Sequence, residues 1–105
     1  MTINNVSVVI ATLGGESIKD TLESLNNSSI VPKEIIICIP EEYATNVKHL
    51  NYSNLKILKT TVRGQVAQRV VGFQNAKFPF VLQLDDDITL DFYCIEKLLD
   101  TVISN

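Results

Sequence analysis

The sequence contains little cysteine, histidine or basic charge. Two cysteines, Cys38 and Cys94, and a single histidine among 105 residues exclude a disulfide framework and an ordinary structural zinc site. Nine Lys and Arg against twelve Asp and Glu give a formal net charge of -3, which argues against nucleic acid as a partner. No apolar run approaches the roughly 20 residues of a membrane-spanning helix, and the N-terminus lacks a signal-peptide pattern. We therefore expect a cytoplasmic protein with reduced thiols, although a longer parent could sit at the inner face of the membrane.

Four short apolar runs predict β-strands. They cover Val6–Ala11, Glu34–Ile39, Leu55–Leu58 and Phe80–Leu84. The first, second and fourth are nearly continuous in apolar residues, which is typical of strands covered on both faces. The third is short and half polar, so we expect it at an edge of the sheet.

Helical patterns alternate with these strands. One helix begins at Ser17, a weaker one covers Glu41–Leu50, a third covers about Gln65–Ala76, and a last one follows Asp91 as a cap. The apolar positions that mark three of them are Ile18, Leu22 and Leu25; Val66, Val70 and Phe73; and Ile95, Leu98, Leu99 and Val102. The alternation predicts one α/β domain over residues 1–105, with a mostly parallel sheet and helices on both faces.

Three consecutive acids, Asp85-Asp86-Asp87, follow the last strand directly. Ligands of such sheets bind beyond the carboxyl ends of the strands, where the strand order reverses. Three neighbouring carboxylates repel one another unless a cation or hydrogen-bond donors compensate, and Mg²⁺ and Mn²⁺ prefer oxygen ligands of this kind. From the residues alone, a solvated acidic turn at a helix start explains the triplet equally well.

Three segments resemble motifs of one family. Val6–Thr12 resembles the opening strand V-S-V-I-I-P-T of family 2 glycosyltransferases, Gly64–Gly72 resembles their G-x-x-x-A-R-N-x-G helix start, and Phe80–Asp87 resembles their Y-[IV]-x-F-L-D-x-D strand and metal motif. The resemblance implies the Rossmann-like, nucleotide-sugar-binding N-terminal half of a GT-A fold. It also implies the strand order 3-2-1-4.

The resemblance further implies roles for individual residues. Ala11 and Thr12 would line the base pocket, and Arg69 would lie near the nucleotide or support the acidic loop. Asp85 would lie near the ribose, whereas Asp87, with Asp86, would hold a divalent metal, Mn²⁺ or Mg²⁺.

Two positions depart from the family pattern. The second strand ends in Ile39-Pro40-Glu41-Glu42 where the family has an Asp-rich segment whose first acid recognises the base. Glu41 could supply that carboxylate, or it could simply begin a helix. Val70 stands where the family has Asn, which removes one polar group.

The function implied is metal-assisted transfer of a sugar from a nucleotide-diphosphate-sugar, with a UDP-sugar favoured, to an acceptor glycan or lipid-linked sugar, as in polysaccharide biosynthesis. The family's general base would lie beyond Asn105, so this chain alone is expected to be the inactive donor-binding part of a longer domain. Self-association through the truncated face is a further expectation. The alternatives are a non-catalytic nucleotide-binding or partner-binding module, and a nucleotidyltransferase, which usually begins with a basic Gly-rich loop.

Overall fold

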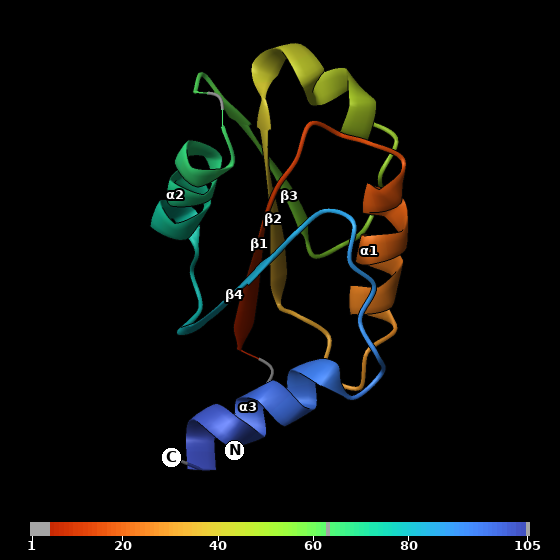
Figure 1. The fold of residues 1–105 in the computed structure, drawn as a ribbon, viewed down its shortest axis with the longest axis vertical. Coiled ribbons are helices and arrows are strands. Elements are labelled where there is room, and N and C mark those ends of the chain that lie inside the picture. Colours follow the sequence, from red (N-terminus) through yellow and green to blue (C-terminus); the bar gives the residue numbers. More distant parts are fainter. Residues whose placement is uncertain (1–4, 63, 105) are drawn as a thin grey trace.

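A computed structural model describes residues 5–62 and 64–104 of the chain. Strands and helices alternate along it (Figure 1). Their bounds are β1 Val6–Ala11, α1 Ser17–Asn26, β2 Glu34–Pro40, the 3₁₀ helix η1 Glu41–Val47, β3 Leu55–Thr60, α2 Gln65–Asn75, β4 Phe80–Leu84 and α3 Cys94–Ser104.

The strands form one sheet in the order β3-β2-β1-β4, and all three strand pairs are parallel. In the middle of the sheet, Val8 of β1 lies beside Ile35 of β2 and Leu82 of β4. The strand order reverses between β1 and β4, as we expected. The predicted α/β fold class and strand order are therefore confirmed.

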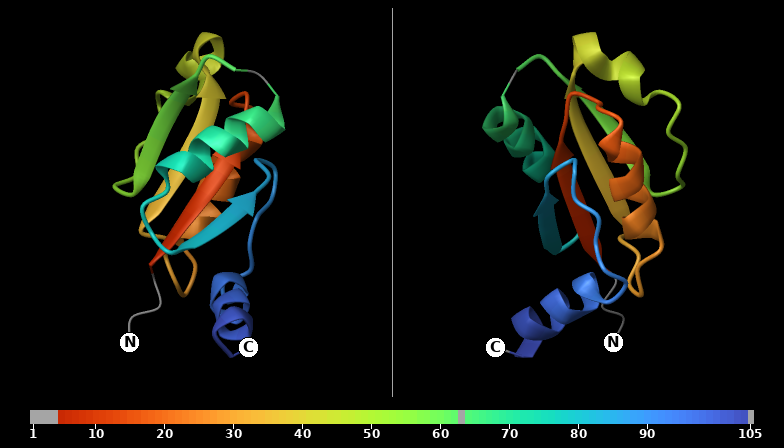
Figure 2. Two further views of the ribbon diagram at one scale, coloured as in Figure 1. Left: turned by 90° about the vertical axis from the view of Figure 1, so that its left-hand side faces the viewer. Right: turned by 45° about the vertical axis from the view of Figure 1, so that its right-hand side comes forward.

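Helices cover both faces of the sheet, with α1 on one side and α2 on the other (Figures 1 and 2). Alternate residues of a strand point to opposite faces, which divides the core in two. Val8, Ile10 and their neighbours pack with α1 in the larger cluster, whereas Val9, Ile36 and Cys38 form a smaller one on the α2 side. Because both faces of β1 and β2 are buried, these strands consist almost entirely of apolar residues.

The apolar stripe predicted for α2 does not face the sheet. Val66 is 74% exposed, and Val70 and Phe73 are also exposed, whereas the buried residues of α2 are Gln68 and Gly72. A Cβ atom at Gly72 would lie within van der Waals radii of Val9 Cγ1 and Cys38 Sγ. The glycine thus permits a close approach of α2 to the sheet, and this approach decides which face is buried.

Two further helices differ from the sequence predictions. The weak helix expected over Glu41–Leu50 is the 3₁₀ helix η1, which ends at Val47. In α3, Ile95 and Leu99 are buried, but Leu98 and Val102 are exposed. The segment after β4 runs down beside α1, so that α3 lies beneath the sheet at the end where the strands begin (Figure 1). Among the described residues, no helix is long and apolar enough to cross a bilayer.

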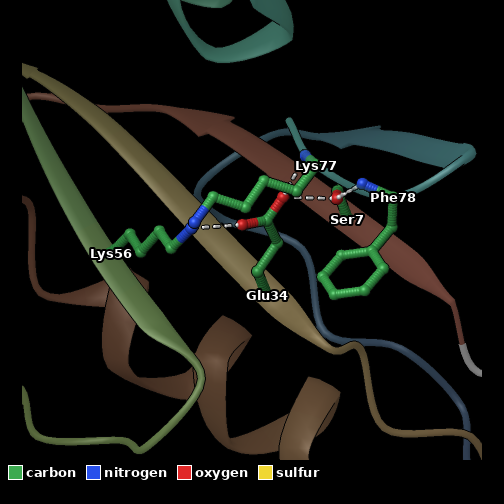
Figure 3. Close-up of polar contacts among 5 residues, drawn as sticks. All are labelled: Ser7, Glu34, Lys56, Lys77 and Phe78. Atoms are coloured by element: carbon green, nitrogen blue, oxygen red, sulfur yellow. Dashed lines mark hydrogen bonds and ion pairs between the residues drawn. The ribbon is translucent and has the colours of Figure 1, made fainter. Parts of the chain in front are cut away.

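A buried carboxylate organises that lower end of the sheet (Figure 3). Glu34 accepts hydrogen bonds from Ser7 Oγ at 2.6 Å, the Lys77 backbone N at 2.6 Å and Lys56 Nζ at 2.7 Å. Ser7 Oγ also accepts one from the Phe78 backbone N at 3.3 Å. Burial by itself raises the pKa of Glu34, but these donors outweigh it, and the net pKa is lowered. The network ties β1, β2, β3 and the connection from α2 to β4 together.

Candidate functional site

Thr12 stands at the carboxyl end of β1 and joins that strand to the acidic triplet. Its hydroxyl donates to Asp86 Oδ2 at 2.6 Å and accepts from the Gly14 backbone N at 2.9 Å. Gly14 has a φ of 82°, in the left-handed region that favours glycine, and this sharp turn returns its N–H to Thr12. The turn and the hydroxyl together hold one carboxylate at the tip of β1.

The backbone of the acidic triplet is held by α1. Ser17 Oγ and Thr21 Oγ1 both donate to the Asp86 carbonyl oxygen, each at 3.1 Å. Asp86 is therefore fixed through its side chain by β1 and through its backbone by α1. The reversal point between β1 and β4 is thus a defined structure and not a free turn.

A cleft of about 420 Å³ opens at this point, beyond the carboxyl end of β1. Its walls come from the tip of β1, from η1, from the first turn of α2 and from the acidic triplet. The residues that line it are Ala11, Thr12, Leu13, Gly15, Tyr43, Gly64, Gln65, Gln68 and Asp86. Asp86 is the only charged side chain among these described residues.

Arg69 and Asp85 form an ion pair beside the cleft. Arg69 Nη2 donates to Asp85 Oδ1 at 2.8 Å, with the Asp85 side chain 54% exposed and that of Arg69 18% exposed. When the Gln83 side-chain amide is oriented with its oxygen toward Arg69, Gln83 Oε1 accepts hydrogen bonds from Arg69 Nε and Nη1, each at 3.2 Å. Of the two roles predicted for Arg69, the contact corresponds to support of the acidic loop; neither Arg69 nor Asp85 lines the cleft.

The structure does not bring every predicted site residue together. Ala11, Thr12 and Asp86 share the cleft, and Asp87 is exposed directly after it. Glu41 is exposed in the first turn of η1 and lines a separate hollow with Glu42, Thr60 and Thr61. The proposed carboxylate contact to a base therefore stays a prediction.

The electrostatics of the cleft limit what it can hold by itself. Among the described residues, no group of three or more His, Cys, Asp or Glu side chains is arranged to hold a metal ion. Burial raises the pKa of the neighbouring Cys38 thiol to about 11, so this sulfur is protonated and is a poor metal ligand. Asp86 and Asp87 could ligate a cation at the cleft. Its remaining ligands would come from water or from a bound molecule.

Comparison with known proteins identifies the family. A family model described as Glycosyl transferase family 2 matches residues 7–105. The chain belongs to glycosyl transferase family 2. Among solved structures, this family 2 chain is similar to the crystal structure of S. aureus TarS 1-349, with 24% sequence identity and a TM-score of 0.75. The match covers 94% of this chain and 32% of the TarS chain, and at this identity it shows the fold alone. No match was found among curated proteins.

Of the described cleft residues of this family 2 chain, the sequence predicted site roles for Ala11, Thr12 and Asp86 but not for Tyr43 or Gln68, among others. Tyr43 belongs to none of the three sequence motifs, yet η1 places it in the cleft wall. Gln68 was hidden inside a helix start whose valines suggested the buried face. The one sequence signal for Gln68 was its spacing of four residues from Gly72, which puts both on the same side of α2.

Proposed function

We propose that this chain is the donor-binding part of a glycosyltransferase and that its cleft binds the nucleoside diphosphate of a nucleotide-sugar, with UDP favoured. One observation carries the proposal: the 2.6 Å hydrogen bond from Thr12 to Asp86, which fixes a carboxylate in a cleft at the strand reversal. Membership of family 2 supports transfer of a sugar as the reaction.

The charges of the cleft support a divalent cation as cofactor. A diphosphate is anionic, and the described lining residues include no Lys or Arg to neutralise it. Among the described lining residues Asp86 alone is charged, and it would repel a diphosphate, whereas a cation between them would attract both. Mg²⁺ and Mn²⁺ are commonly held by one or two carboxylates together with phosphate oxygens and water, and Asp86 with Asp87 fits this donor set. Held by Asp86 and Asp87, such an ion would stabilise the negative charge that develops on the leaving diphosphate.

The residues of this chain would position the donor. Transfer breaks the bond between the anomeric carbon and the diphosphate oxygen, and a bond to the acceptor hydroxyl oxygen forms as its proton moves to a base. Thr12 and Ser17 hold Asp86 in place. This carboxylate therefore needs to move little as the leaving group becomes charged, and the reorganisation energy is small. The positive end of the α2 dipole, at Gly64 and Gln65 in the cleft wall, favours an anionic ligand.

We further propose that this chain binds the donor without transferring the sugar, because the family resemblance assigns the general base to a position beyond Asn105. The acceptor, a glycan or a lipid-linked sugar, would be bound by that further part.

Calorimetric titration of the chain with UDP tests the proposal. We expect heat of binding in the presence of Mn²⁺ and none in EDTA. Asp86→Asn should weaken binding at least about tenfold, about 1.4 kcal/mol, because it removes a charged ligand of the cation. Asp100→Asn, which removes the same charge from an exposed position on α3, should bind as the unmodified chain does. Absence of metal-dependent heat with UDP, GDP, CDP and ADP alike would refute the proposal.

A further inference from the structure

Gln68 is a buried polar residue where a helix on a sheet normally buries an apolar one. Its exposed fraction is 2%, and it lies on the side of α2 that faces β1 and β2. Buried polar groups are costly unless they are hydrogen-bonded, so each one in a native structure calls for an explanation. The valines that would suit this position energetically point outward instead.

The orientation of the Gln68 amide is fixed by two strand ends. Nε2 donates to the Thr12 carbonyl oxygen at 3.1 Å and to the Cys38 carbonyl oxygen at 2.8 Å. Because both partners are carbonyl groups, only the nitrogen of the amide can face them. Both amide hydrogens are thereby used. No hydrogen bond between the described residues uses Oε1, and Gln68 lines the cleft, so its remaining group there is a fixed hydrogen-bond acceptor.

The position of Gln68 across the sheet indicates which part of a ligand it would meet. Its two partners are Thr12, directly after β1, and Cys38 of β2, whereas Asp86 follows β4, on the other side of β1 from β2. Tyr43, in η1 after β2, lines the same cleft and offers an aromatic surface. If the diphosphate lies at Asp86, as the proposed function requires, the nucleoside extends toward Gln68 and Tyr43.

We propose that Gln68 is a specificity-determining residue that recognises the nucleobase through its side-chain oxygen. Its Oε1 accepts a hydrogen bond from a base with a ring N–H, such as N3–H of uracil or N1–H of guanine. Cytosine and adenine have an unprotonated ring nitrogen at the corresponding position, so two acceptors would face each other and both would lose their water partners. The inference rests on the proposed function, because it assumes that the diphosphate lies at Asp86.

The affinities for UDP and CDP, measured by calorimetric titration in the presence of Mn²⁺, test this hypothesis, since the two ligands have nearly the same shape. We expect the unmodified chain to bind UDP at least about tenfold more tightly than CDP. Gln68→Met, of similar length but without the acceptor, should remove the preference by weakening UDP far more than CDP. Gln74→Met, the same substitution at an exposed position of α2, should keep it.

A purely structural role for Gln68 predicts another result. Loss of its bonds to Thr12 and Cys38 would weaken the binding of UDP and CDP by the same factor and leave the ratio of their affinities unchanged, which would overturn the inference.

If Gln68→Met does not fold, 3-methyl-UDP and the unmodified chain provide the test. Removing the N3–H should reduce affinity to that of CDP, and equal affinity for UDP and 3-methyl-UDP would overturn the inference. Binding without base preference refutes only this inference, whereas no binding of any diphosphate refutes the proposed function.

Discussion

Two polar side chains, Thr12 and Glu34, perform corresponding tasks at opposite ends of the parallel strands. At the carboxyl end of the strands, the Thr12 hydroxyl holds Asp86, which lies 74 positions later in the sequence. Glu34 joins three donors at the amino end, where the chain returns from α2 into β4. A carboxylate buried this deeply is tolerated because its oxygens are satisfied by a charged group and by neutral donors. The site at one end thus depends on a strand frame that is fixed at the other.

Replacement of Glu34 should therefore change how stability depends on pH. Since its pKa is lowered from 4.5 in the folded state, its contribution is complete above about pH 4.5 and is lost as the pH falls through the folded-state value. We expect Glu34→Gln to lower the free energy of unfolding at pH 7 by about 1–3 kcal/mol. The difference in the free energy of unfolding between this variant and the unmodified chain should be smaller at pH 3 than at pH 7. Urea denaturation at pH 7 and at pH 3 measures it.

Lys56 supplies the control for that experiment. Its side chain is 41% exposed and its charge is screened by solvent, so Lys56→Met should lower the free energy of unfolding at pH 7 much less than Glu34→Gln does. An effect of Glu34→Gln that is the same at pH 3 as at pH 7 would show that the carboxylate charge contributes nothing.

Among the elements, α2 connects packing with the site. Gly72 allows the helix to approach Val9 and Cys38, and one turn earlier this approach brings Gln68 to the strand ends. A helix held farther from the sheet could not make both hydrogen bonds of the Gln68 amide. The small residue and the buried amide therefore belong to one arrangement.

Gly72→Ala should destabilise the fold, although alanine is the better helix former. The added methyl group has no space between two buried side chains, and overpacking of this kind costs about 1–3 kcal/mol. Gly15→Ala is the matched control, because no atom lies within 4 Å of its added Cβ and its φ is not positive. Thermal unfolding should show a lower melting temperature for Gly72→Ala only. An unchanged or higher value would mean that α2 does not pack as described.

The elements differ in how far the sequence predicts them. The strands could be located because runs such as Val6–Ala11 and Glu34–Ile39 are apolar throughout, and their order followed from the family resemblance. The buried face of α2 could not, because it depends on contacts of Gln68 with Thr12 and Cys38 that are distant in sequence.

The candidate site was predictable to a similar extent. Thr12 and Asp86 were recognisable from motifs at the ends of β1 and β4. Tyr43 was not, because only the fold of η1 carries it into the cleft.

At the scale of the whole molecule, apolar side chains remain exposed on the outer face of α2 and on β4, the strand at one end of the sheet order. They are Val66, Val70 and Phe73 on α2 and Val81 on β4. The strand Phe80–Leu84 contains no charged residue and no proline, the features with which sheet edges usually prevent pairing. We therefore predict that a second copy of the chain pairs along β4.

Sedimentation velocity over a range of concentrations measures this association. Val81→Lys should shift the equilibrium toward monomer, because the charge lies beside the pairing edge. Val31→Lys places the same charge at a position of similar exposure outside the sheet and should not. Monomers at every concentration, or equal effects of the two variants, would rule out pairing through β4.

The central claim, that a nucleoside diphosphate and a divalent cation bind where β1 and β4 diverge, is tested most directly by NMR of the ¹⁵N-labelled chain with UDP and Mn²⁺. Mn²⁺ broadens the amide signals nearest to it, and a Mg²⁺ sample supplies the unbroadened reference. We predict that the signals of Thr12 and Asp85–Asp87 disappear while those of Glu34 and Lys77, at the other end of the sheet, keep their intensity. Broadening centred elsewhere, or none at the acidic triplet, would contradict the account.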